Sequence, residues 1–125
     1  LHGDPMHAFP HFLGHADEVG YSEGEGFNFN YPMPAGTSFS AWSKSLDLAL
    51  QQISKFGADA LIVSLGVDTF EKDPISFFKL ASDDFIKMGA RIASLNLPTL
   101  FVMEGGYAVE EIGINTVNVL MGFEA

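Results

Sequence analysis

The chain of 125 residues has the length of one domain, and its 47% hydrophobic and 18% charged residues exclude a disordered or fibrous protein. Sixteen acidic and six basic residues give a net charge of −10, which repels phosphate groups and argues against nucleic-acid binding. No apolar run approaches the ~20 residues that cross a membrane, no secretory leader is visible, and the lack of cysteine suits a cytoplasmic protein.

Residues 1–36 predict an irregular, loop-rich segment, because they hold 6 of the 13 glycines, 4 of the 6 prolines and all four histidines. The stretch GFNFNYP at 26–32 alternates aromatic residues with asparagine, which predicts a short, half-buried strand. His7, His11 and His15 have the four-residue spacing of helical metal sites. Pro10 would break such a helix, so the spacing argues little for a metal site.

Residues 37–125 predict a unit of helix, strand, helix, strand and helix. Both strands are continuous apolar runs, which is typical of a parallel sheet covered by helices on its two faces. The alternation predicts an α/β fold with right-handed crossovers. The helices are expected from Thr37 or Ser38 to Gly57, from Ser82 to Asn96, and around Val109, Ile112, Val117 and Leu120, and the strands at ADALIVSLG (58–66) and TLFVMEGG (99–106).

Asp68 and Tyr107 each follow one of the two predicted strands. A parallel sheet would bring both residues to one edge, where α/β proteins bind their ligands. Asp68 could ligate a metal ion or only cap the next turn of the chain. Tyr107 could donate a hydrogen bond to an oxyanion or pack beneath the last helix.

Four residues near Asp68 and Tyr107 in the sequence also have expected roles. Gly105 and Gly106 let the backbone come close to a ligand. Asp73, which precedes a proline, is expected to shape its own loop, and Glu104 is expected to accept hydrogen bonds from nearby backbone groups.

Four motifs together resemble the zinc-dependent histone deacetylase family, and within it they are most similar to the bacterial acetylpolyamine amidohydrolases. The similarity extends over essentially all 125 residues, and the last two motifs are specific in their order and spacing. It implies that the two strands belong to a larger, mostly parallel eight-stranded sheet. The motifs are LHGDPMHAFPHFLGHADEVG (1–20), GEGFNFNYPMPAGT (24–37), SLGVDTFEKDPISFFKL (64–80) and MEGGYAVEEIG (103–113).

The resemblance also implies roles for individual residues. Asp68 matches a zinc ligand, and Tyr107 matches the catalytic tyrosine that donates to the transition state. The implied substrate is a small cationic acetylated amine, such as an acetylated polyamine or an acetyl-lysine-like group, and the charge of −10 is compatible with it. The positions that match the substrate tunnel are Phe9, Gly105 and Gly106, and the carbonyl of Leu1 matches part of a site for a monovalent cation such as K⁺.

The sequence departs from the family pattern at one point. The pattern includes two adjacent histidines and an Asp-x-His pair, and neither occurs here. In the family these residues precede the first motif, so we expect the chain to be the C-terminal portion of a longer enzyme and inactive by itself. A missing N-terminal half or a second copy of the chain would then cover the sheet. The alternatives are a non-catalytic module of the same origin that self-associates or binds a partner, and a hydrolase completed in trans by a separate chain.

Overall fold

The computed structural model describes all residues from 1 to 125 and confirms the predicted α/β fold. The strands form three separate parallel pairs, β1 with β2, β3 with β5 and β4 with β6. In chain order the elements are β1 (His2–Gly3), the short 3₁₀ helix η1 (Ser22–Gly24), β2 (Pro32–Met33), β3 (Thr37–Ser38), α1 (Phe39–Phe56), β4 (Leu61–Leu65), β5 (Phe78–Lys79), α2 (Ser82–Ala93), β6 (Thr99–Met103) and α3 (Ile112–Glu124).

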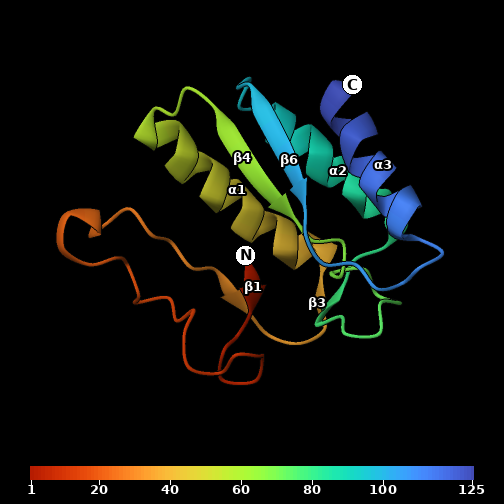
Figure 1. The fold of residues 1–125 in the computed structure, drawn as a ribbon, viewed down its shortest axis with the longest axis horizontal. Helices are drawn as coiled ribbons and strands as arrows, with labels where there is room; N and C mark the ends of the chain where they lie inside the picture. Colours follow the sequence, from red (N-terminus) through yellow and green to blue (C-terminus); the bar gives the residue numbers. More distant parts are fainter.

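The pair of β4 and β6 is the structural centre of the fold. Figure 1 shows the two strands running side by side, and all five residues of each strand are paired. Backbone bonds continue past the strand ends, since the N–H of Glu104 donates to Leu65 at 2.9 Å and that of Val67 donates to Gly105 at 2.7 Å. The loops that follow the two strands therefore leave from one edge in close contact.

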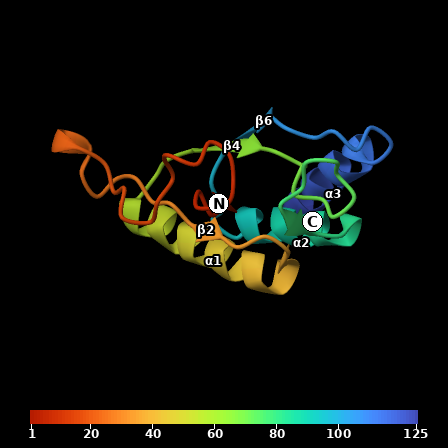
Figure 2. The ribbon, with the colours of Figure 1, turned by 90° about the horizontal axis from the view of Figure 1, so that it is seen from below.

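Helices α1, α2 and α3 lie on one side of this pair, as the view from below shows (Figure 2). Gly57 ends α1, as predicted, and adopts the left-handed conformation. The Asp84 carboxylate accepts a bond from the N–H of Ala81 at the start of α2. No helix is both long enough and apolar enough to span a membrane. The buried residues that α1 and α2 contribute to the core are Trp42, Leu46, Leu50, Phe85, Met88 and Ile92.

The opposite face of β4 and β6 is open, so the helices of this chain cover only one of the two apolar faces, and the other needs cover from elsewhere, as expected. Ile62 is 70% exposed and Leu100 is 59% exposed, although both are large aliphatic residues in the middle of strands. The reason is topological, because the three helices α1, α2 and α3 all lie on the same side (Figure 2). The apolar character of the strands on both faces is real, but this chain buries only one of them.

The predicted strand within 26–32 is also wrong over most of its length. Only Pro32 and Met33 form a strand, and they pair with β1. The amide of Asn28 donates to the carbonyl of Glu18 at 2.6 Å, and that of Asn30 donates to the carbonyl of His15 at 3.1 Å. The asparagines therefore bind a neighbouring loop through their side chains, an alternative to sheet pairing that this residue type favours.

Helices α2 and α3 pack closely through two glycines. A methyl group on Gly89 would collide with the carbonyl oxygen of Val119, and one on Gly122 would collide with the carbonyl oxygen of Ile86. The last helix is present as predicted, although it begins at Ile112 and leaves Val109 in the preceding loop. Its buried apolar residue is Val119, whereas Val117 is half exposed. The contact with α2 selects the buried face of α3.

Candidate active site

Asp68 follows β4 at the edge where the loops of the two strands meet. A Cβ atom on Gly105 would collide with Oδ2 of Asp68, and one on Gly66 would lie 3.0 Å from Oδ1. The carboxylate therefore occupies space that two missing side chains leave, and it lies against the loop that follows β6. Glycine at position 105 is required for this approach of backbone and carboxylate.

Burial of the Asp68 carboxyl raises its pKa, and the negative charge of Asp73 raises it further. Neither of the two ion pairs in the structure involves Asp68, so no lysine or arginine offsets this cost. An anionic side chain that is partly desolvated and lacks a cationic partner is suited to bind a cation.

Tyr107 lies on the loop after β6, and its side chain is 52% exposed. Its hydroxyl forms no hydrogen bond within the chain, whereas its backbone N–H donates to Oδ2 of Asp73 at 2.7 Å. Gly106 lies against Val67, so that a Cβ atom there would be 2.6 Å from the valine Cγ2. The alternative of a tyrosine packed beneath the last helix is wrong, and the phenol is free to contact a ligand.

Asp73 has a second role that the sequence did not reveal. As expected, it shapes its own loop, because Oδ1 accepts a bond from the N–H of Ile75 at 3.1 Å. Its Oδ2 also accepts bonds from the backbone of Tyr107 and, at 3.0 Å, of Ala108. These partners are 34 and 35 residues away, so no local pattern announces the contact. Glu104, by contrast, is exposed and accepts none of the predicted hydrogen bonds.

The remaining predicted site residues lie in the first part of the chain. The Phe9 side chain is 90% exposed and does not line the cavity described below, so its role as a tunnel wall stays a prediction. The site for a monovalent cation at the Leu1 carbonyl likewise stays a prediction.

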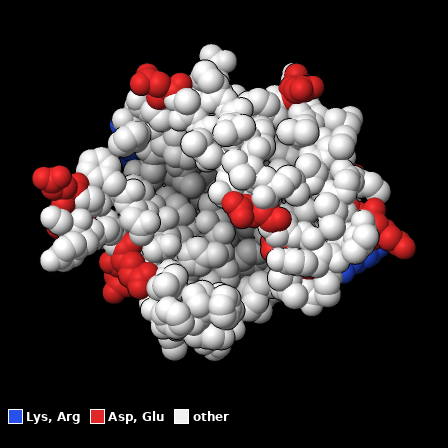
Figure 3. Space-filling model, viewed as in Figure 1, with Lys and Arg blue, Asp and Glu red and all other residues white.

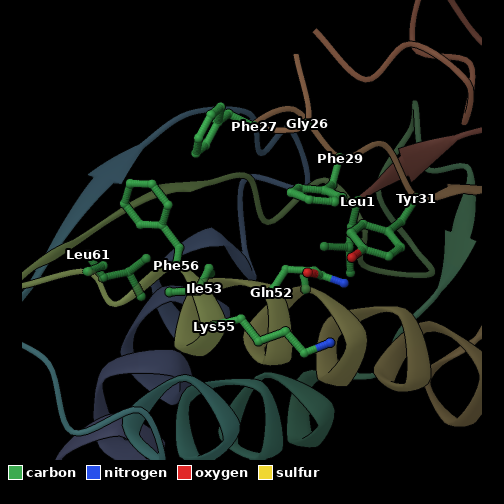
Figure 4. Close-up of a pocket in the computed structure, with 12 residues that line it drawn as sticks. Leu1, Gly26, Phe27, Phe29, Tyr31, Gln52, Ile53, Lys55, Phe56 and Leu61 are labelled. Atoms are coloured by element: carbon green, nitrogen blue, oxygen red, sulfur yellow. The ribbon is translucent and has the colours of Figure 1, made fainter. Parts of the chain in front are cut away.

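A cavity of about 700 Å³ lies between residues 26–31 and α1, and neither Asp68 nor Tyr107 lines it. Figure 4 shows its aromatic lining, in which the rings of Phe27 and Phe56 meet edge to face with centroids 5.9 Å apart. The lining is mainly apolar and includes no acid or histidine. Its apolar lining is that of a gap in the packing, and the candidate catalytic residues Asp68 and Tyr107 do not line it.

The chain alone does not provide the donor set of a zinc site. No group of three histidine, cysteine, aspartate or glutamate side chains comes together in the structure, whereas zinc takes at least three protein ligands. The segment that holds His7, His11 and His15 forms no helix, so the helical arrangement that their spacing would need is wrong. Asp68 fits the role of one ligand among several.

Residues 1–122 match the family model of the histone deacetylase domain. The chain therefore belongs to the histone deacetylase family. Acetylpolyamine amidohydrolase 2 of Pseudomonas aeruginosa is 62% identical over 124 residues, which cover 99% of this chain and 36% of that protein. The acetylpolyamine amidohydrolase of Mycoplana ramosa is 60% identical over 122 residues, which cover 98% of this chain and 36% of that protein.

Among solved structures, the acetylpolyamine aminohydrolase from Burkholderia pseudomallei superposes with a TM-score of 0.95 at 41% identity. The match covers 98% of this chain and 36% of that structure. The chain thus spans about 36% of the length of the relatives that it matches, and within that span the fold is shared almost completely.

Proposed function

We propose that residues 1–125 are a portion of a zinc-dependent amidohydrolase that removes acetyl groups from acetylated polyamines or acetyl-lysine-like amines. The observation that carries the proposal is the shared edge of β4 and β6. There the Asp68 carboxylate lies against Gly105, and Tyr107 follows in the same loop after β6. The 62% identity to an acetylpolyamine amidohydrolase supports the substrate class.

Each residue at this edge has a distinct task in the proposed reaction. Asp68 would hold zinc together with ligands from outside this segment, and bound zinc supplies a Lewis acid at the scissile amide. The free hydroxyl of Tyr107 would donate a hydrogen bond to the oxygen that becomes negative when the amide is attacked. The acidic surface favours a substrate with a distal ammonium group, since Figure 3 shows acidic side chains on this face and Lys or Arg only at its rim.

The test is hydrolysis of an acetylated polyamine and of an acetyl-lysine peptide by the complete protein that carries this segment, loaded with zinc. We expect amine release from the polyamine, and no turnover by the isolated 125 residues, because one ligand does not retain zinc. Turnover by the purified segment, or no turnover of either substrate by the complete protein, would contradict the proposal.

The open face of β4 and β6 favours a second candidate, a non-catalytic module that self-associates. Exposed Ile62 and Leu100 would then lie in a contact between two copies. This candidate predicts that the isolated chain sediments as a dimer that dissociates only on unfolding, and that Ile62→Lys converts it to a monomer. Retention of zinc when a second, histidine-bearing chain is added would instead favour assembly of a hydrolase in trans.

A further inference from the structure

We infer that Asp73 is the positioning residue of Tyr107: it holds the backbone of the tyrosine so that the phenol is presented at the carboxyl edge of β4 and β6. The inference rests on the proposed function and deepens it. It adds a residue that touches neither the substrate nor the metal and whose hydrogen bonds reach the site through the backbone of Tyr107.

The contact joins two loops that are remote in sequence. Oδ2 of Asp73 accepts hydrogen bonds from two successive N–H groups, those of Tyr107 at 2.7 Å and Ala108 at 3.0 Å. The Asp73 residue is only 7% exposed, so these bonds are shielded from water. Bonds from neutral donors to a carboxylate are stronger than those to a neutral acceptor.

Asp73 is itself held in place. Its N–H donates to the carbonyl of Phe70 at 3.0 Å, and its carbonyl accepts from the N–H of Ser76 at 3.1 Å. Its other carboxylate oxygen accepts from Ile75 at 3.1 Å. The loop after β4 therefore provides a fixed acceptor to which the loop after β6 is attached.

At Tyr107 itself, the bond to Asp73 is the one hydrogen bond that the residue makes. The residues on either side are held separately, since the Gly105 carbonyl accepts from the N–H of Val67 at 2.7 Å and the Ala108 carbonyl accepts from that of Ile112 at 3.0 Å. The phenol is half exposed and makes no hydrogen bond of its own, so the bond from Asp73 fixes the backbone from which it projects. A reacting group that is displaced by about 1 Å can lose about 100-fold in rate.

The arrangement favours a carboxylate over an amide. All three donors that reach the Asp73 side chain are backbone N–H groups, two on Oδ2 and one on Oδ1. An amide would have to turn its NH₂ group toward one of them. Asparagine can keep its oxygen on Tyr107 and Ala108 and lose only the bond from Ile75, so it is expected to replace aspartate in part.

The experiment compares Asp73→Ala and Asp73→Asn in the complete, zinc-loaded protein, each with and without Tyr107→Phe. We expect Asp73→Ala to lower kcat by about 10- to 100-fold with little change in KM, and Asp73→Asn to restore part of the loss. In the Tyr107→Phe background Asp73→Ala should cause little further loss, because the group through which it acts is gone. The exchange of the Tyr107 and Ala108 amide hydrogens should be faster in Asp73→Ala than in the unchanged protein.

Asp84→Ala is the matched control, because Asp84 also accepts a hydrogen bond from a backbone N–H, that of Ala81 at 3.0 Å, but on α2. It should reduce thermal stability without a change in kcat or in exchange at Tyr107. A kcat effect of Asp73→Ala that is fully additive with Tyr107→Phe, or equal to that of Asp84→Ala, overturns the inference. If Asp73→Ala does not fold, Asp73→Ser takes its place, because the serine hydroxyl is one bond too short to reach both N–H groups. Unaltered exchange at Tyr107 together with an unaltered kcat in that variant overturns the inference.

Failure of the proposed function is distinguished from failure of the inference by the exchange measurement. A complete protein that hydrolyses neither substrate contradicts the proposed function. Slow exchange of the Tyr107 amide that persists in Asp73→Ala contradicts the positioning role, whether or not the protein is active.

Discussion

At the end of β4 a carboxylate is held partly out of water, next to another acid and without a cationic side chain beside it. Burial raises the pKa of Asp68, and the charge of Asp73 adds to the effect. Such a carboxylate destabilises the folded chain when it is ionised, because folding must desolvate a charge that the unfolded chain exposes. A residue that lowers stability at the edge of a parallel sheet is typical of a binding site.

Asp68→Asn is therefore expected to stabilise the metal-free chain at neutral pH. Because the folded pKa of Asp68 is raised, the folded state binds its proton more tightly, and stability falls as the pH rises from about 4 through the raised pKa. The gain from asparagine should be full at pH 7 and should vanish below about pH 4. Urea unfolding midpoints across this range, with a chelator present, measure the effect, and a less stable asparagine variant at pH 7 would contradict it.

Gly105→Ala should displace the carboxylate of Asp68. The new methyl group would overlap Oδ2 of Asp68, the movable end of a side chain, so the fold should adapt while the acid moves. We expect kcat of the complete protein to fall by about 100-fold with little change in the unfolding midpoint. Gly113→Ala, where nothing lies within 4 Å of the added carbon, is the control and should retain full activity.

At the scale of elements, the sequence pattern located α1, β4, α2 and β6 because each depends on local properties. The helical spacing of apolar residues, the glycine at 57 and the apolar strands are all visible in one window of sequence. The alternation of helix and strand was enough to place Asp68 and Tyr107 at one edge.

What the pattern missed depends on contacts between distant residues. The bond from Asp73 to the Tyr107 loop and the asparagine amides that bind residues 15 and 18 have no local signature. The buried face of α3 follows from close approach to α2 at Gly122, which a hydrophobic pattern in α3 alone does not specify.

Gly122→Ala tests this helix contact. The added methyl group would overlap the carbonyl oxygen of Ile86 and lie 2.8 Å from its carbon, and backbone atoms cannot rotate away. Separation of α2 and α3 should destabilise the chain by about 1–3 kcal/mol. Gly113→Ala, on the same helix but in open space, should be neutral or stabilising by up to about 1 kcal/mol. Equal unfolding midpoints for the two variants would show that the helices are not packed as described.

At the scale of the whole molecule, the chain is a half-covered sheet. The open face of β4 and β6 carries exposed Ile62, Leu100 and Val102, and Figure 3 shows that this side of the molecule is also hollowed. The chain spans about 36% of the length of its relatives. In the proposed enzyme, residues outside this segment would cover that face and also provide the other zinc ligands, so one proposal explains both features.

The most direct test of this account is the activity of Tyr107→Phe in the complete, zinc-loaded protein, measured with an acetylated polyamine. We expect kcat to fall by about 100- to 1,000-fold, the usual effect of removing one donor to a developing oxyanion. Tyr21→Phe, which removes the hydroxyl of a fully exposed tyrosine in the N-terminal loop, should leave kcat unchanged. Full activity of Tyr107→Phe would contradict the claim that β4 and β6 bring an acid and a phenol into one catalytic site.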